Sequence, residues 1–368
     1  MRARLPLFIG VFVVMALSNA IVPVLPSFAS GTTAQGALFS AYFLGAFLLV
    51  LPAGYLADRI GEVPLIRTGL LLTFISGIVL AVAPSPALVL AGRLLEGFGA
   101  GLFVPAALAL LNARPDHERM SGYFMALLNL GLLVGLLGTG WLVLRWAAGA
   151  YAGIYLFTIV SVLPLALSFA METRTPGAAG VPVETASATF KRLKLVFSSY
   201  FWLWASAVLI IGITGALTAL HPEFTDLSPD LVSQEIALMN LATIAAILVA
   251  SHASLPPVPT IRAAAVAMAG AVTLTFFTVW GFLLVGWLAG MVMISQLAFL
   301  AGVSARQGVL MGLFNTASYG GMTLLPFLAG ALAEYAGFPA AFAAIALSAL
   351  LVAATIGRCG CSVKAGDA

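Results

Sequence analysis

Arg93 and Glu96 lie three residues apart inside a long apolar run of this sequence. On a helix, side chains at positions i and i+3 share a face, so these two can form an ion pair. Such a pair could bind an anionic group through the arginine, and it could take up and release a proton through the glutamate. It could also serve only to fix the packing of helices, and the sequence leaves both interpretations open.

Other polar side chains occur singly within the remaining apolar runs. A polar group that faces lipid has no hydrogen-bond partner, so such side chains should point into a shared interior. We therefore predict a pathway for substrate or protons that is lined by Asn19, Arg93, Glu96, Asn129, Asn240, Gln296, Asn315 and Tyr319. Hydrogen bonds between helices would explain any one of them as well.

The apolar runs themselves define the fold class. Of the 368 residues, 62% are hydrophobic and 8% are charged, whereas a soluble domain carries about 25% charged residues. Because the runs are continuous and near the roughly 20 residues of a membrane-spanning helix, we predict an all-α polytopic membrane protein. The twelve predicted spans cover residues 5–29, 36–56, 65–83, 87–111, 120–144, 148–171, 198–220, 233–251, 261–279, 282–303, 308–334 and 339–357.

Every third span, namely 65–83, 148–171, 261–279 and 339–357, lacks strongly polar residues at mid-membrane and is free to face lipid. Lysines and arginines cluster on one set of connections, while Arg145 lies on the other, which predicts a multi-pass protein of the cell membrane with both termini cytoplasmic. We expect an N-terminal six-helix bundle over 1–171 and a C-terminal one over 198–357. A cytoplasmic linker with an amphipathic helix over 172–197 and a tail over 358–368 complete the chain.

An internal repeat supports this division. Met125–Asn129 is similar to Met311–Asn315 at an offset of 186 residues, and Gly135 corresponds to Gly321 at the same offset. Both copies run from inside to outside, as parallel repeats about an axis along the membrane normal require. The repeat predicts two pseudo-symmetric bundles.

The segment Gly54-Tyr-Leu-Ala-Asp-Arg-Ile-Gly61 joins two of the predicted spans. It resembles the loop between helices 2 and 3 of the major facilitator superfamily of transporters, which reads Gly-x-Leu-Ala-Asp-Arg-x-Gly and continues with two basic residues. Here Glu62 and Val63 stand in place of the basic pair. The resemblance implies a gate whose latch is Asp58 against the inner end of the eleventh helix. The gating residues that we expect are Gly54, Asp58, Arg59, Gly61 and, as a second partner, Arg114.

Two further spans resemble the same family. The run from Arg93 to Gly99 is similar to the pattern Arg-x-x-Gln-Gly-x-Gly of the fourth helix, with Glu96 at the glutamine position. The span 120–144 is rich in glycine, like the fifth helix that the family associates with antiporters, although the family's Gly-Pro step is absent. Its glycines could equally serve tight packing alone. The family implies twelve helices in two bundles and transport by alternating access.

We therefore expect a secondary active transporter of a small solute, with proton-coupled efflux as the favoured mode. The alternative is a sensor or scaffold that keeps a transporter fold without transport, and the missing basic pair after Gly61 lends it weight. The sequence has no nucleotide-binding Gly-Lys-Ser/Thr loop and no cluster of metal ligands, so we expect neither an enzyme nor a cofactor. The expected partners are a small-molecule substrate, protons and the lipid bilayer, without nucleic acid, and the expected state is a monomer.

Overall fold

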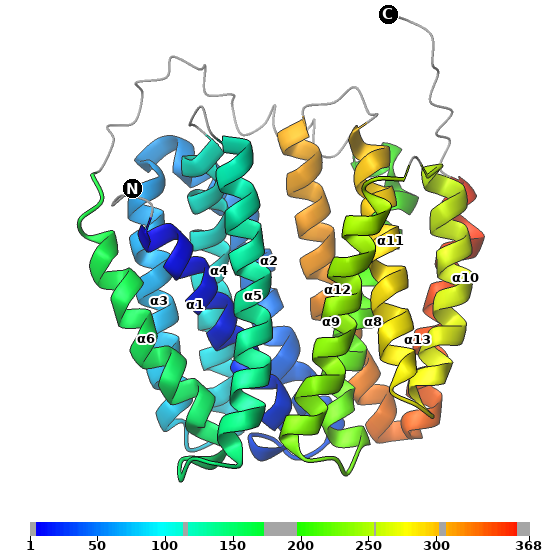
Figure 1. The fold of residues 1–368 in the computed structure, drawn as a ribbon, viewed down its shortest axis with the longest axis horizontal. Helices are drawn as coiled ribbons and strands as arrows, with labels where there is room; N and C mark the ends of the chain where they lie inside the picture. Colours follow the sequence, from blue (N-terminus) through cyan, green and yellow to red (C-terminus); the bar gives the residue numbers. More distant parts are fainter. Residues whose placement is uncertain (1–4, 113–116, 173–196, 254, 302–306, 359–368) are drawn as a thin grey trace, which may run out of the picture. The chain divides into compact units, whose positions relative to one another are not determined.

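The computed structural model describes residues 5–112, 117–172, 197–253, 255–301 and 307–358. Every regular element within these ranges is a helix (Figure 1). The α-helices are α1 (Leu5–Ala20), α2 (Thr32–Ile60), α3 (Glu62–Val82), α4 (Pro86–Asn112), α5 (His117–Val143), α6 (Ala152–Ser168), α8 (Phe201–Phe224), α9 (Pro229–Ala250), α10 (Pro257–Thr275), α11 (Trp280–Ala301), α12 (Gln307–Ala336) and α13 (Phe338–Thr355). Short 3-10 segments are η2 (Val22–Ser27), η3 (Gly149–Tyr151) and η4 (Ile356–Arg358).

Each of the twelve predicted spans contains one of these α-helices, which confirms the twelve-helix prediction for the described residues. Ten of the described helices are long and apolar enough to cross a bilayer. The first span differs from the prediction, because α1 ends at Ala20 and the chain continues as η2. Pro23 is the reason: it has no backbone N–H to donate, and it disfavours helical geometry in the residue before it.

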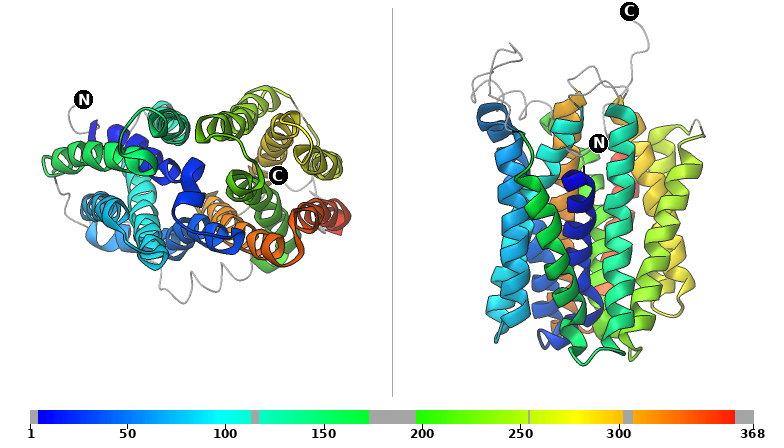
Figure 2. Two further views of the ribbon diagram at one scale, coloured as in Figure 1. Left: turned by 90° about the horizontal axis from the view of Figure 1, so that it is seen from below. Right: turned by 60° about the vertical axis from the view of Figure 1, so that its left-hand side comes forward.

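The chain divides into two compact units. The first comprises residues 1–183 together with 219–234, a segment that holds the end of α8 and the start of α9. The second comprises residues 184–218 and 235–368. Figure 2 shows the helices of each unit from the end and from the side.

In the first unit, α4 packs against both α2 and α3, while α1 packs against α5 and α6. Their contact surfaces bury large apolar side chains completely, among them Val11, Phe103 and Phe124. In the second unit, α10 packs against α11 and α13. Helix α4 therefore lies among the helices of its unit and carries its polar side chains into the interior.

Glycines bring the helices of both units close together. A Cβ on Gly97 of α4 would collide with the backbone carbonyl oxygen of Tyr42 on α2, and one on Gly286 of α11 would collide with that of Met239 on α9. The repeat predicted for Gly135 and Gly321 shows the same device. Gly135 lies against the backbone of α1, and Gly321 lies against the backbone of α8. The internal repeat thus places close helix contacts at matching positions of the two units.

Arg67 on α3 holds the end of α6. Its Nε donates a hydrogen bond to the carbonyl oxygen of Ser168 (3.1 Å), and its Nη2 donates one to that of Met171 (2.6 Å). The guanidinium also lies over the ring of Phe169, 5.5 Å from its centroid. Carbonyl groups at a helix C-terminus lack partners within the helix and attract cations, so Arg67 caps α6.

The helices that we expect to face lipid expose large apolar side chains. Examples are Ile78 on α3 (43% exposed), Ile159 on α6 (69%), Val266 on α10 (54%) and Leu347 on α13 (63%). Such surfaces would be costly in water and suit a bilayer. They agree with the prediction drawn from the missing polar residues of these spans.

Candidate functional site

The ion pair predicted on α4 is present and completely buried. Nη1 of Arg93 lies 2.5 Å from Oε2 of Glu96, and neither residue has measurable exposure. The three-residue spacing on one helix brings the two groups to the same face. Isolating two charges from water costs several kcal/mol per ion, on the order of magnitude known for proteins, and only a close partner offsets this. Each group therefore depends on the other.

Arg93 also binds two other helices. Its Nη1 donates to the carbonyl oxygen of Ser18 on α1 (3.0 Å), and its Nε donates to that of Leu38 on α2 (3.3 Å). The Ser18 carbonyl is one of the last four of α1, which have no acceptor role within the helix and are open to other donors. The break at Pro23 thus supplies a partner for the arginine.

An aromatic ring completes the surroundings of the guanidinium. The guanidinium carbon of Arg93 lies 5.0 Å from the centroid of the Tyr42 ring. A cation over the face of a tyrosine ring is stabilised by about 0.5–2 kcal/mol, with the larger values where water is excluded. Helices α1, α2 and α4 consequently meet at one charged side chain.

The carboxylate of Glu96 is satisfied on one side only. Oε2 accepts the hydrogen bond from Arg93, whereas Oε1 is buried and has no hydrogen-bond partner among the described residues. A buried acceptor without a partner is costly and is uncommon in folded proteins. Oε1 is therefore a position at which a proton, or a donor group from a ligand, would find an unused acceptor.

The second unit has apolar residues at the corresponding places. Gly286 on α11 contacts α9 as Gly97 on α4 contacts α2. Counted from these glycines, Arg93 corresponds to Phe282 and Glu96 to Val285, and both apolar side chains are fully buried (1% and 0% exposed). The same packing position can thus be filled without charge.

The other predicted pathway residues of the first unit lie on α1 and α5. Asn19 is half-buried, and its Nδ2 donates to the carbonyl oxygen of Leu132 on α5 (3.1 Å). Asn129 is also partly exposed, and its Nδ2 donates to the carbonyl oxygen of Met125 one turn earlier (2.8 Å). These hydrogen bonds satisfy the amides, and a contact with substrate stays a prediction.

In the second unit, Gln296 on α11 is fully buried, and its Nε2 donates to Oγ of Ser206 on α8 (2.9 Å). Its Oε1 has no hydrogen-bond partner among the described residues. Asn240 on α9 and Tyr319 on α12 are half-buried, and Asn315 on α12 is exposed. The structure brings Gln296 and Ser206 together, whereas a common site for the residues of both units stays a prediction.

The expected gate residues lie at the junction of α2 and α3. Gly61 has φ +83°, and its N–H donates to the carbonyl oxygen of Ala57 (2.9 Å). Gly54 differs from the expectation of a turn residue, because α2 continues through it to Ile60 and the turn is made at Gly61 alone. Asp58 and Arg59 lie in the last turn of α2, and Arg114 lies outside the described residues. The latch stays a prediction.

Sequence reasoning missed the partners of Arg93. Tyr42 gives a usable signal, because it is a phenol in the middle of an apolar span. The carbonyl groups of Ser18 and Leu38 leave no signal in their side chains. Pro23 marks the end of α1 and would have pointed to free carbonyls just before it.

A family profile described as Major Facilitator Superfamily matches residues 7–319 of this chain. The chain belongs to the major facilitator superfamily. A solved D-xylose-proton symporter has the same fold, with a TM-score of 0.74 at 13% identity over 100% of this chain and 99% of that chain. Members of this superfamily are transporters, and this protein is a multi-pass membrane transporter rather than an enzyme.

Two curated relatives are named for drug resistance. The chain is 32% identical over 129 residues to a "Multidrug resistance protein B homolog" of Mycobacterium tuberculosis, a match that covers 35% of this chain and 23% of the relative. It is 28% identical over 136 residues to the "Quinolone resistance protein NorA" of Staphylococcus aureus, and this match covers 35% of each. The chain thus spans about a quarter to a third of the length of these relatives.

Proposed function

We propose that this protein exports a small hydrophobic or amphipathic solute by alternating access, in exchange for protons that bind Glu96. The observation that carries the proposal is the buried ion pair of Arg93 and Glu96, whose acceptor Oε1 is unused among the described residues. Asn19, Asn129, Asn240, Gln296, Asn315 and Tyr319 complete the proposed pathway.

The comparison of the two units favours function over packing for this pair. Buried ion pairs can often be replaced by apolar side chains without loss of stability. The second unit makes that replacement with Phe282 and Val285. If stability alone decided the residue at this position, the first unit would gain nothing from a charged pair.

The geometry suggests how a proton could act on the helices. When Glu96 takes up a proton, its negative charge disappears and the contact with Arg93 weakens. The guanidinium then keeps only its carbonyl partners on α1 and α2 and the Tyr42 ring. Protonation thereby changes the bonds that join three helices, which is what a coupled transporter needs in order to favour one state over another.

The direction of transport is supported by the names of the relatives, which are resistance proteins. The mechanism that we propose is rocking of two six-helix bundles, residues 1–171 and 198–357, about a site at mid-membrane. The segment 172–197 would join them on the cytoplasmic side, where both termini and the tail 358–368 also lie. We expect the protein to act as a monomer in the cell membrane.

Glu96→Gln tests the proposal directly. A thermal-shift screen on purified protein first selects a ligand, with quinolones and lipophilic dyes as the starting set. In proteoliposomes with an imposed pH gradient, we expect Glu96→Gln to lose uphill transport of that ligand, because the amide cannot exchange a proton. Exchange of labelled for unlabelled ligand without a gradient should persist.

Glu62→Gln is the matched control. This variant removes one carboxylate at the start of α3, outside the buried pair, and it should keep gradient-driven transport. Full uphill transport by Glu96→Gln would contradict proton coupling at this residue. Loss of uphill transport and exchange together in Glu96→Gln, with a normal melting temperature, would assign the residue to substrate binding instead.

A further inference from the structure

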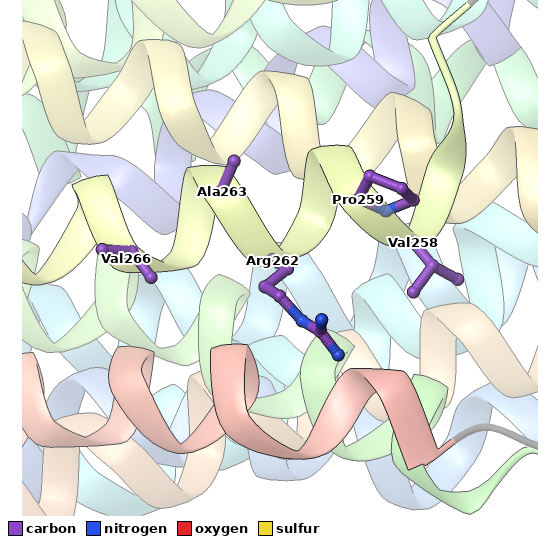
Figure 3. Close-up of a pocket in the computed structure, with 5 residues that line it drawn as sticks. All are labelled: Val258, Pro259, Arg262, Ala263 and Val266. Atoms are coloured by element: carbon purple, nitrogen blue, oxygen red, sulfur yellow. The ribbon is translucent and has the colours of Figure 1, made fainter.

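An open hollow of about 540 Å³ lies along the first turns of α10. Val258, Pro259, Ala263 and Val266 form its apolar lining, and Arg262 is the charged residue among them (Figure 3). The lining is exposed or half-buried, and Val266 is 54% exposed. The hollow is thus an apolar surface with one cation, on a helix that we expect to face lipid.

The Arg262 side chain extends from α10 towards the end of α13, as Figure 3 shows. Its Nη2 lies so close to Gly357 in η4 that a Cβ at residue 357 would collide with it. Glycine at this position therefore makes room for the guanidinium.

A second arginine follows directly. Arg358 is exposed, and its guanidinium carbon lies 5.9 Å from the ring centroid of Trp202 on α8. Tryptophan is enriched where membrane proteins meet the headgroup layer. Arg262, Arg358 and Trp202 belong to the same compact unit, so their arrangement does not depend on the other unit.

No acidic side chain balances these cations in the part of the chain that the structure describes. Neither arginine forms a salt bridge there, and the pair Arg93–Glu96 lies in the other unit. Two cations on either side of Gly357 without a carboxylate form a site of positive potential.

We propose that this hollow binds an anionic phospholipid, with its phosphate between Arg262 and Arg358 and an acyl chain along Val258 and Val266. A soluble phosphate would leave the apolar lining in water, whereas a lipid supplies both the anion and the chain. By the orientation proposed above, the lipid belongs to the cytoplasmic leaflet, whose anionic lipids attract basic residues. This site is independent of the transport pathway and of Glu96.

The test compares phosphatidylglycerol with phosphatidylcholine of the same acyl chains, titrated into the purified full-length protein in detergent and followed by native mass spectrometry. We expect phosphatidylglycerol to bind more tightly. Arg262→Gln should weaken its binding about fivefold, which corresponds to the roughly 1 kcal/mol that one basic residue contributes near a lipid surface. Arg262→Lys should keep most of the affinity, because the charge remains.

Arg119→Gln on α5 is the matched control, since Arg119 is an exposed arginine of the other unit. It should bind phosphatidylglycerol as the unchanged protein does. Equal binding of both lipids, an unchanged affinity of Arg262→Gln, or full displacement of the lipid by inorganic phosphate would each overturn the proposal. If Arg262→Gln proves too unstable to purify, Arg358→Gln provides the same comparison, with the same expected weakening.

Discussion

Arg93 directs its donors to one carboxylate and two backbone carbonyl groups, and its charge lies over the Tyr42 ring. These contacts come from three helices, so the residue connects elements that are distant in sequence. The dependence of each charge on its partner leads to a prediction about stability as well as about transport.

Arg93→Met should destabilise the protein by about 3–5 kcal/mol, because it leaves the Glu96 carboxylate buried without a counter-ion. The double variant Arg93→Met with Glu96→Leu should recover most of this loss, since an apolar pair of similar volume is often neutral or stabilising. Thermal unfolding in detergent measures both variants. Neither should transport against a gradient.

The opposite ranking would be informative. If the double variant is as unstable as Arg93→Met, the hydrogen bonds to Ser18 and Leu38 hold the fold, and compensation of charge does not. Glu96→Gln, which keeps a hydrogen-bond acceptor for the arginine, is the control for the loss of charge alone.

Much of this site was accessible from the sequence, and part of it was not. The pairing of Arg93 with Glu96 follows from their spacing on a helix, which needs no knowledge of the tertiary structure. The carbonyl partners and the position of the Tyr42 ring depend on how α1 and α2 pack against α4. Backbone carbonyls are the same in every residue, so the sequence cannot mark them.

At the scale of the helices, the contact between α4 and α2 depends on a missing side chain. Gly97→Ala places a Cβ against the carbonyl oxygen of Tyr42, a backbone atom that cannot rotate away. We expect a loss of about 1–3 kcal/mol, as for other overpacked sites, measured as a lower melting temperature in detergent.

Gly270→Ala on α10 is the matched control. The space around its Cβ position is open, and the residue lies inside a helix. Alanine should leave stability unchanged or raise it by up to about 1 kcal/mol, because it is the better helix former. Equal losses in both variants would show that helix propensity or expression, and not the close approach of α2, determines the effect.

The helices themselves were largely predictable. Their positions follow from the length of the apolar runs, because a span without water must satisfy its backbone within the helix. The two differences concern local chemistry. Pro23 divides the first span, and α2 passes through Gly54, where the sequence suggested a turn. Proline acts through its missing donor, whereas a glycine permits a turn without requiring one.

At the scale of the whole molecule, the internal repeat joins two units that are alike in packing and unlike in charge. Gly97 and Gly286 make matching contacts, yet one unit carries Arg93 and Glu96 where the other carries Phe282 and Val285. Repetition of the backbone was predictable from the offset of 186 residues between Asn129 and Asn315. The difference in charge shows that only one unit holds an ion pair at this position.

Asp58→Asn tests the latch that the family resemblance implies. Loss of the carboxylate should favour the inward-facing state, because its attraction to the amide groups at a helix N-terminus disappears. Single cysteines at the inner ends of the spans, introduced after replacement of Cys359 and Cys361, should react faster with a water-soluble reagent. Glu62→Gln is the control, and an unchanged rate in Asp58→Asn would contradict the latch.

Arg67 has a mechanical consequence for the route out of the first unit. Beyond Met171 the chain leaves the carbonyl groups that this side chain holds. A pull on that exit would first have to break hydrogen bonds anchored in α3, so the load passes to a neighbouring helix before the final turn of α6 can unwind. One guanidinium thus acts as a tether that separates tension in the outgoing strand of polypeptide from the integrity of the helix behind it.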